Sequence, residues 1–105
     1  MRTVNRGLHY SFRLYLLNAD GKRVLGKGGA QILEAIDRLG SVLAASKELE
    51  MSHTFVRRYI HRMENRLGEK VVARKTSKGT ALTPLARKLL RDYRDATERL
   101  RKHLP

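Results

Sequence analysis

The stretch 40–68 places two helix starts only eleven residues apart, and this feature limits the possible folds more than any other. Ser41 and Ser52 are both good N-caps, so the sequence predicts a short helix over 42–49 and a longer one over 53–67. A short helix that is joined to a longer one by so tight a turn is typical of a helix-turn-helix. In that arrangement the second helix is the recognition helix, which enters the major groove of DNA.

Strand-like and helix-like patterns flank this pair. Apolar and polar side chains alternate before the turn sequence Asn18–Gly21, which predicts a hairpin, and Thr83-Pro84 is a typical helix start. The remaining predicted elements are an N-terminal hairpin (8–25), a first helix (30–39), a wing hairpin (70–83) and a long C-terminal helix (84–103). Together they predict one domain over 1–105, mainly helical with small β-hairpins: a winged helix-turn-helix.

The charge of the chain points to a polyanionic partner. Lys and Arg exceed Asp and Glu by 23 to 10, a formal net charge of +13. The excess is concentrated from residue 53 onward, where 15 basic residues face 5 acidic ones, against 8 and 5 before it. A face that serves only solubility usually mixes both signs, so double-stranded DNA is the expected partner. The sequence contains no cysteine and no apolar run of the ~18 residues that a membrane span needs.

The recognition helix has one apolar stripe, Val56, Ile60 and Met63, and a polar face opposite to it. We expect base contacts from Ser52, His53, Thr54, Arg57 and Arg58, with Arg57 foremost because arginine can bind guanine bidentately. We expect backbone contacts from Ser41, His61, Arg62, Arg66, Arg74, Lys75, Thr76, Ser77 and Lys78. For any single arginine, plain exposure to solvent is the alternative.

The C-terminal helix carries a second apolar stripe. Its members recur at spacings of three and four: Leu85, Leu89, Tyr93, Ala96, Leu100 and Leu104. The first turns of this helix must cover the core of the domain itself. From Tyr93 onward the stripe predicts a dimer seam in the manner of a coiled coil, with purely intramolecular packing as the alternative.

Several segments together resemble a known family. Gly40–Ser52, Met63–Arg74 and Ala81–Ala86 resemble the helix-turn-helix shared by LysR-type regulators and the N-terminal domain of ModE, the molybdate-responsive regulator. Phe12–Leu16, with Asp20-Gly21 and Leu25-Gly26 after it, is similar to the strand hairpin that precedes the DNA-binding domain of ModE. The likeness extends from about Tyr10 to Leu104.

The resemblance implies a homodimeric winged-helix transcription factor that dimerises through its first and last helices. The interface residues that this implies are Ile32, Ile36, Leu89, Tyr93, Ala96, Leu100 and Leu104. The sequence up to Pro105 contains no counterpart of the molybdate-binding domains of full ModE proteins, and no small-molecule effector is evident. The wing is shorter than usual for this family, and the start of the recognition helix differs in sequence.

Other chemistry is not favoured. The run 26–29 lacks the spacing of a phosphate-binding loop and is expected to separate the hairpin from the first helix. The four histidines show no metal-ligand spacing and the acidic residues no catalytic pairing, so we expect neither a cofactor nor enzymatic activity. The expected function is a sequence-specific, cytoplasmic and nucleoid-associated regulator. The alternatives are a nonspecific architectural DNA-binding protein and an RNA-binding or protein-interaction winged helix.

Overall fold

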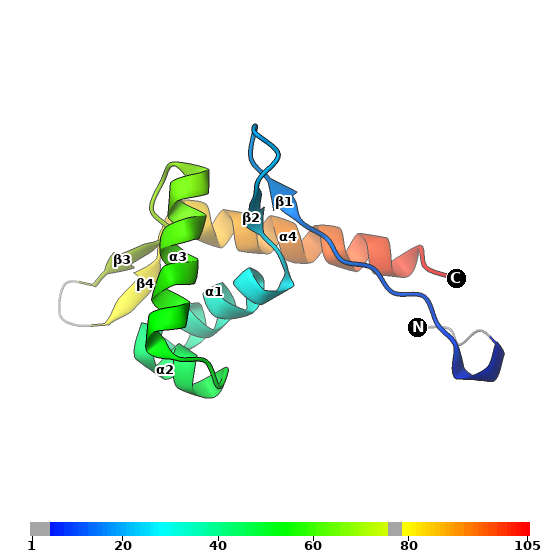
Figure 1. Cartoon of the computed structure of the whole chain (residues 1–105), viewed down its shortest axis with the longest axis horizontal. Helices are drawn as coiled ribbons and strands as arrows, with labels where there is room; N and C mark the ends of the chain where they lie inside the picture. Colours follow the sequence, from blue (N-terminus) through cyan, green and yellow to red (C-terminus); the bar gives the residue numbers. More distant parts are fainter. Residues whose placement is uncertain (1–4, 76–78) are drawn as a thin grey trace.

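The computed structural model describes residues 5–75 and 79–105 and shows four α-helices with two small antiparallel hairpins (Figure 1). The helices are α1 (Lys27–Leu39), α2 (Val42–Glu48), α3 (His53–Leu67) and α4 (Pro84–Lys102). The strands are β1 (Leu16–Leu17), β2 (Arg23–Leu25), β3 (Val72–Arg74) and β4 (Thr80–Leu82), and a 3₁₀ turn, η1, covers Asn5–Gly7. The molecule measures 53 × 32 × 21 Å because the distal part of α4 projects from the body, with the N-terminal segment beside it (Figure 1).

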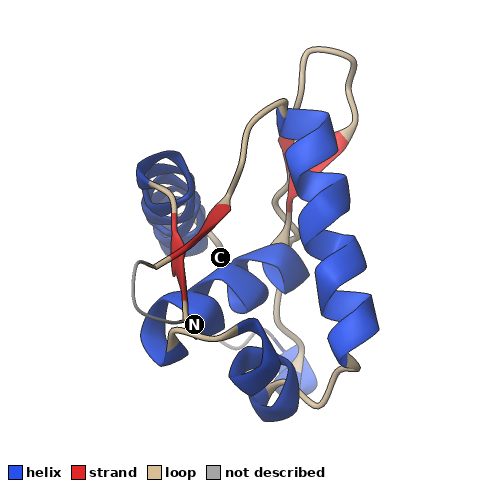
Figure 2. Ribbon diagram, turned by 90° about the vertical axis from the view of Figure 1, so that its left-hand side faces the viewer, coloured by secondary structure: helices blue, strands red, loops and turns tan. Residues whose placement is uncertain are grey.

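The core lies around α1, which packs against α2, α3, β2, β4 and α4. Figure 2 shows α1 crossing between α3 on one side and α4 on the other. The largest fully buried apolar side chains come from β2, α1, α3 and the start of the wing: Leu25, Ile32, Leu33, Ile36, Val56 and Val71. Burial of this continuous apolar surface is the main stabilising contribution and fixes α3 against the body.

Local capping explains where α2, α3 and α4 begin. The hydroxyls of Ser41, Ser52 and Thr83 each accept a hydrogen bond from the backbone N–H three residues further on, at 3.0 to 3.2 Å. Gly40 and Gly68 end α1 and α3 in the left-handed conformation. The last turns are slightly shorter than the sequence predicts, since α2 ends one residue before Leu49 and α4 one residue before His103, both of which are C-caps.

The start of α1 differs from the expectation of a helix over 30–39. The residues Lys27, Gly28 and Gly29 form its first turn and do not separate the hairpin from it. Gly29 is buried, and a Cβ there would lie 3.1 Å from a ring carbon of Tyr59 and 3.0 Å from Leu25. The close packing of these side chains favours glycine at this position despite its low helix propensity.

The N-terminal hairpin is much shorter than the range 8–25 suggested. Leu16 pairs with Leu25 and Leu17 with Arg23, and the chain before them is irregular and mostly exposed, with 63% of Leu8 and 53% of Tyr10 accessible. A strand needs a partner for its backbone groups, and β2 ends at Leu25 because α1 begins two residues later. The apolar alternation before Leu16 was therefore a misleading strand signal.

The wing pairs β3 with β4 in register, with Ala73 opposite Ala81. The loop end of the wing is fixed to the end of α1, because the N–H of Thr80 donates to the carbonyl oxygen of Gly40 at 2.8 Å. Gly79 has φ +88°, and a Cβ there would lie 2.8 Å from that same oxygen, so glycine is required for this close approach.

Candidate nucleic-acid interface

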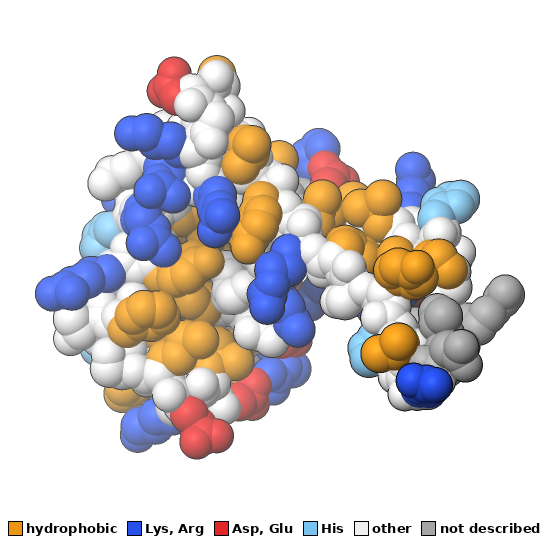
Figure 3. All heavy atoms as spheres, turned by 45° about the vertical axis from the view of Figure 1, so that its right-hand side comes forward, with side chains coloured by type: hydrophobic (Ala, Val, Ile, Leu, Met, Phe, Trp, Pro, Cys, Tyr) orange, Lys and Arg blue, Asp and Glu red, His pale blue; other side chains and the backbone are white. Residues whose placement is uncertain are grey.

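The predicted base-reading residues lie together at the exposed start of α3. Ser52, His53, Thr54, Arg57 and Arg58 are all exposed. The helix is held from behind by a buried stripe of Val56, Ile60 and Met63, as the periodicity predicts. Lys and Arg side chains gather on the body of the domain beside an apolar area (Figure 3). The donors of α3 therefore face solvent while its opposite side is anchored in the core.

The arginines of α3 occupy two different flanks. Arg57 and His61 lie on the side of the wing, where they line a shallow groove with Lys70. On the other side the guanidinium of Arg62 lies over the ring of Tyr59, 4.9 Å from its centroid. A single helix thus presents cations toward both of the elements that flank it.

Arg66 differs from the other predicted backbone contacts because it turns toward the N-terminal hairpin. It is half-buried, and its Nη1 donates to the carbonyl oxygen of Arg23 at 2.8 Å. The carbonyl oxygen of Arg66 in turn accepts from Nδ2 of Asn18, the first residue of the hairpin turn, at 3.1 Å. The end of α3 and the hairpin are therefore joined by two hydrogen bonds.

The wing supplies two exposed cations, Arg74 and Lys75. The other predicted wing contacts, Thr76, Ser77 and Lys78, lie outside the described residues. Ser41 caps α2, as the sequence suggests, and is half-buried.

A buried carboxylate fixes the wing to α3. Only 8% of Glu64 is exposed, and its Oε2 accepts a hydrogen bond from the N–H of Val71 at 2.9 Å. Its Oε1 lies 3.8 Å from Nδ1 of His61 and 3.7 Å from Nζ of Lys70. This acidic residue sets the position of β3 relative to the exposed face of α3.

Comparisons with known proteins identify the family of the chain. Residues 29–87 match the model of the bacterial regulatory helix-turn-helix proteins of the lysR family, which is more than half of the chain. The chain belongs to the LysR family. The expected winged helix-turn-helix fold is thereby confirmed, and with it the LysR part of the expected resemblance. The ModE part stays a prediction. A comparison with curated proteins returned no match.

Several solved structures share the fold of this LysR-family chain. A structure of the DNA-binding domain of CbnR in complex with DNA superposes with a TM-score of 0.59 at 26% identity, over 70% of this chain and 83% of that one. ArgP from Mycobacterium tuberculosis gives 0.57 and 26%, and oxidised OxyR from Corynebacterium glutamicum gives 0.54 and 25%, each over 70% of this chain. The chain covers 27% and 25% of those two longer chains.

The predicted dimer residues of this LysR-family chain divide into two groups. Ile32 and Ile36 are fully buried inside one chain, so their assignment to a dimer interface was wrong. The physical reason is that α1 is the central helix, and its whole apolar face is used by the core. The others keep accessible surface: on α4, Leu89, Tyr93 and Ala96 are half-buried and Leu100 is 43% exposed, and Leu104, two residues after the end of α4, is half-buried.

Sequence reasoning missed two aromatic residues of α3. Phe55 is 49% exposed, and its ring meets that of Tyr59 edge to face, with 6.1 Å between centroids. An aromatic residue outside the apolar stripe was the available signal for Phe55.

In the described ranges, 5–75 and 79–105, no cluster of three His, Cys, Asp or Glu residues could hold a metal ion. None of the four helices described is long and apolar enough to cross a membrane.

Proposed function

We propose that this LysR-family domain is a sequence-specific double-stranded DNA-binding transcriptional regulator that acts as a homodimer. The observation that carries the proposal is the exposed cationic start of α3, held from behind by the core. The match to the CbnR DNA-binding domain, which was solved with DNA, supports a duplex as the ligand. Because bacterial DNA lies in the cytoplasm, we propose a cytoplasmic, nucleoid-associated location.

In this proposal α3 lies in the major groove, and its first two turns read base edges. Arg57 and Arg58 are exposed and long enough to donate two hydrogen bonds to the N7 and O6 atoms of guanine. His53 and Thr54 stand one turn earlier, and Phe55 adds an apolar surface that suits a thymine methyl group. Ser52 contributes its hydroxyl while it caps the helix.

Backbone contacts come from the residues around this face. His61 and Arg62 lie further along α3, Ser41 at the start of α2, and Arg74 and Lys75 on the wing. Phosphate contacts position a protein on the duplex, and a basic wing suits the backbone or the adjacent minor groove. We extend this assignment to Thr76, Ser77 and Lys78 on sequence grounds alone.

For the homodimer we propose the partly accessible apolar stripe of α4. Leu89, Tyr93 and Ala96 line an apolar groove together with Leu14 and Leu16 of the N-terminal segment. Leu100 continues the stripe on the projecting part of the helix, and Leu104 follows just after its end. A second α4 packed there would bury apolar surface that one chain leaves accessible.

Selection of bound duplexes from a random pool tests the proposal. We expect inverted repeats with half-sites about 10 bp apart, or a multiple of that, since a dimer places two α3 helices on one face of the duplex. Arg57→Ala should abolish the base preference at one position of each half-site, and Lys75→Ala should weaken all duplexes about equally.

Two results would contradict the proposal. One is a pool without a preferred motif, in which Arg57→Ala and Lys75→Ala lose the same affinity and binding scales with duplex length, as for an architectural protein. The other is preference for structured RNA over duplex DNA in a direct competition.

A further inference from the structure

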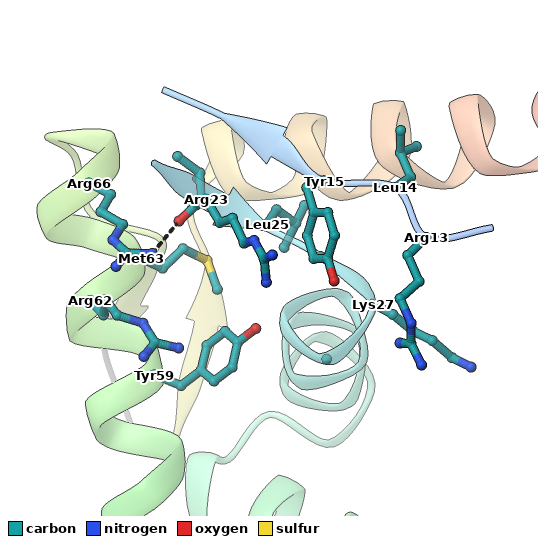
Figure 4. Close-up of a pocket in the computed structure, with 13 residues that line it drawn as sticks. Arg13, Leu14, Tyr15, Arg23, Leu25, Lys27, Tyr59, Arg62, Met63 and Arg66 are labelled. Carbon is teal, nitrogen blue, oxygen red and sulfur yellow. Dashed lines mark hydrogen bonds between the residues drawn. The ribbon is translucent and has the colours of Figure 1, made fainter. Parts of the chain in front are cut away.

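A cavity of about 440 Å³ lies between the N-terminal hairpin, the start of α1 and the hairpin-facing flank of α3 (Figure 4). Five of its lining residues are cations: Arg13, Arg23, Lys27, Arg62 and Arg66. The lining contains no Asp or Glu, and within 5–75 and 79–105 none of these five side chains forms an ion pair. A concave site with this charge and without an internal counter-ion attracts an anion.

Two tyrosines shape the cavity and position its arginines. The Arg23 guanidinium lies 4.0 Å from the ring centroid of Tyr15, and Arg62 lies over Tyr59 on the other side. Figure 4 shows the side chains of Tyr15, Arg23 and Tyr59 directed toward the first turn of α1. The Arg23 side chain lies between the two tyrosine rings. Stacking holds each guanidinium by its face and leaves the N–H groups at its edge free to donate.

The floor of the cavity is the backbone at the start of α1. A Cβ on Gly26 would lie 2.9 Å from the Tyr15 ring, so glycine lets this ring close over the chain. The first intrahelical hydrogen bond of α1 is donated by Ala30 to Gly26, so the N–H groups of Gly28 and Gly29 have no acceptor within the helix. Of these two glycines, Gly28 lines the cavity, so its amide adds a donor to a site whose charge comes from the side chains around it.

We infer that this cavity binds a phosphate group. Arginine guanidinium edges, tyrosine hydroxyls and backbone amides are the donors that recognise a tetrahedral oxyanion, and this site offers all three. The inference goes beyond the matched family region, since the hairpin side of the cavity lies before residue 29.

The position of the cavity favours a phosphate of the DNA backbone, and this part of the inference depends on the proposed function. The wing lies on one side of α3 and the hairpin on the other (Figure 1). A helix in a major groove has a sugar-phosphate backbone on each side. The wing then faces one strand, and the cavity faces the other, with Arg62 shared between the cavity and the exposed face of α3.

A titration of the full chain with inorganic phosphate, followed by amide NMR at constant ionic strength, tests the cavity without DNA. We expect saturable shifts at Gly28 and Gly29. The apparent Kd should rise about fivefold to tenfold in Arg23→Gln, because one charge-assisted hydrogen bond is lost. Lys27→Gln should act in the same direction. Lys102→Gln, an equal loss of charge at the far end of α4, is the matched control and should leave the Kd unchanged.

The second measurement is the dependence of duplex affinity on salt. If the phosphate belongs to DNA, Arg23→Gln lowers the slope of log K against log salt by about one, and Lys102→Gln does not. A normal slope with altered phosphate titration supports a free phosphorylated ligand. Failure to bind any duplex would refute the proposed function while the phosphate titration still decides on the cavity. Identical titrations and slopes in wild type and Arg23→Gln would overturn the inference.

Discussion

Replacement of Glu64 by methionine tests how the wing is held. The side chain is nearly isosteric but lacks both oxygens, so the N–H of Val71 loses its acceptor. Val71 is fully buried, which leaves no room for water to replace the carboxylate. A buried donor left without a partner costs about 1–3 kcal/mol, and we expect Glu64→Met to lower the free energy of unfolding by about 2 kcal/mol.

Thermal unfolding followed by circular dichroism measures this loss. For 105 residues the unfolding entropy is about 0.2 kcal/mol per kelvin, so 2 kcal/mol corresponds to a fall in Tm of about 9 °C. Glu64→Gln keeps a carbonyl acceptor and should lose roughly half as much. Glu69→Gln removes the same charge from an exposed position and should stay within about 0.5 kcal/mol of wild type.

Two outcomes would refute this reasoning. If Glu64→Met melts with the wild type, the hydrogen bond to Val71 contributes nothing to the fold. If Glu69→Gln is destabilised as much as Glu64→Gln, the effect is one of overall charge. Partial proteolysis gives an independent measurement. In Glu64→Met the wing is no longer held to α3 by this hydrogen bond, so the protease should cut the wing faster than it cuts α3 of the same variant.

Three further predictions concern other contacts. Gly79→Ala should lower the free energy of unfolding by at least about 2 kcal/mol, because its Cβ would meet the carbonyl oxygen of Gly40. Gly68→Ala has a similar positive φ of +79° but open space around the new Cβ, so it should lower it by only about 1 kcal/mol. Urea unfolding compares the two variants. Burial, with a smaller effect of Tyr15, raises the pKa of Tyr93 above its ordinary value. The folded chain therefore keeps this proton to a higher pH than the unfolded chain, and the free energy of unfolding falls as the pH rises above about 10. Urea titrations at several pH values should show a smaller fall in Tyr93→Phe. Ser52→Asp keeps the helix cap but adds a negative charge to the exposed face, so Tm should be unchanged while duplex affinity, measured by fluorescence anisotropy, decreases.

Local signals were sufficient for much of the helical fold. Ser41, Ser52 and the pair Thr83-Pro84 each form the predicted cap, and Gly40 and Gly68 end the predicted helices. These signals act between residues that are three or four positions apart, so the sequence alone displays both partners. The same applies to the division of α3 into a buried stripe and an exposed face.

The errors came from interactions between distant segments. Gly29 lies in α1 with Tyr59, thirty residues later in the chain, packed closely on it. Ile32 and Ile36 have the spacing of an interface as well as of a core, and only the packing of α1 at the centre distinguishes the two. Glu64 gave no signal, because its partner is a backbone N–H that the wing brings to it.

The polar ties on both flanks of α3 have a consequence for how a duplex can fit. On one side Glu64 joins it to the wing, and on the other Arg66 and Asn18 join it to the hairpin. Because α3 is hydrogen-bonded on both sides, it cannot tilt or slide relative to the rest of the domain to follow an imperfect groove. The adjustment then falls to the nucleic acid, so flexible pyrimidine–purine steps beside the half-site should favour binding even where no side chain touches them.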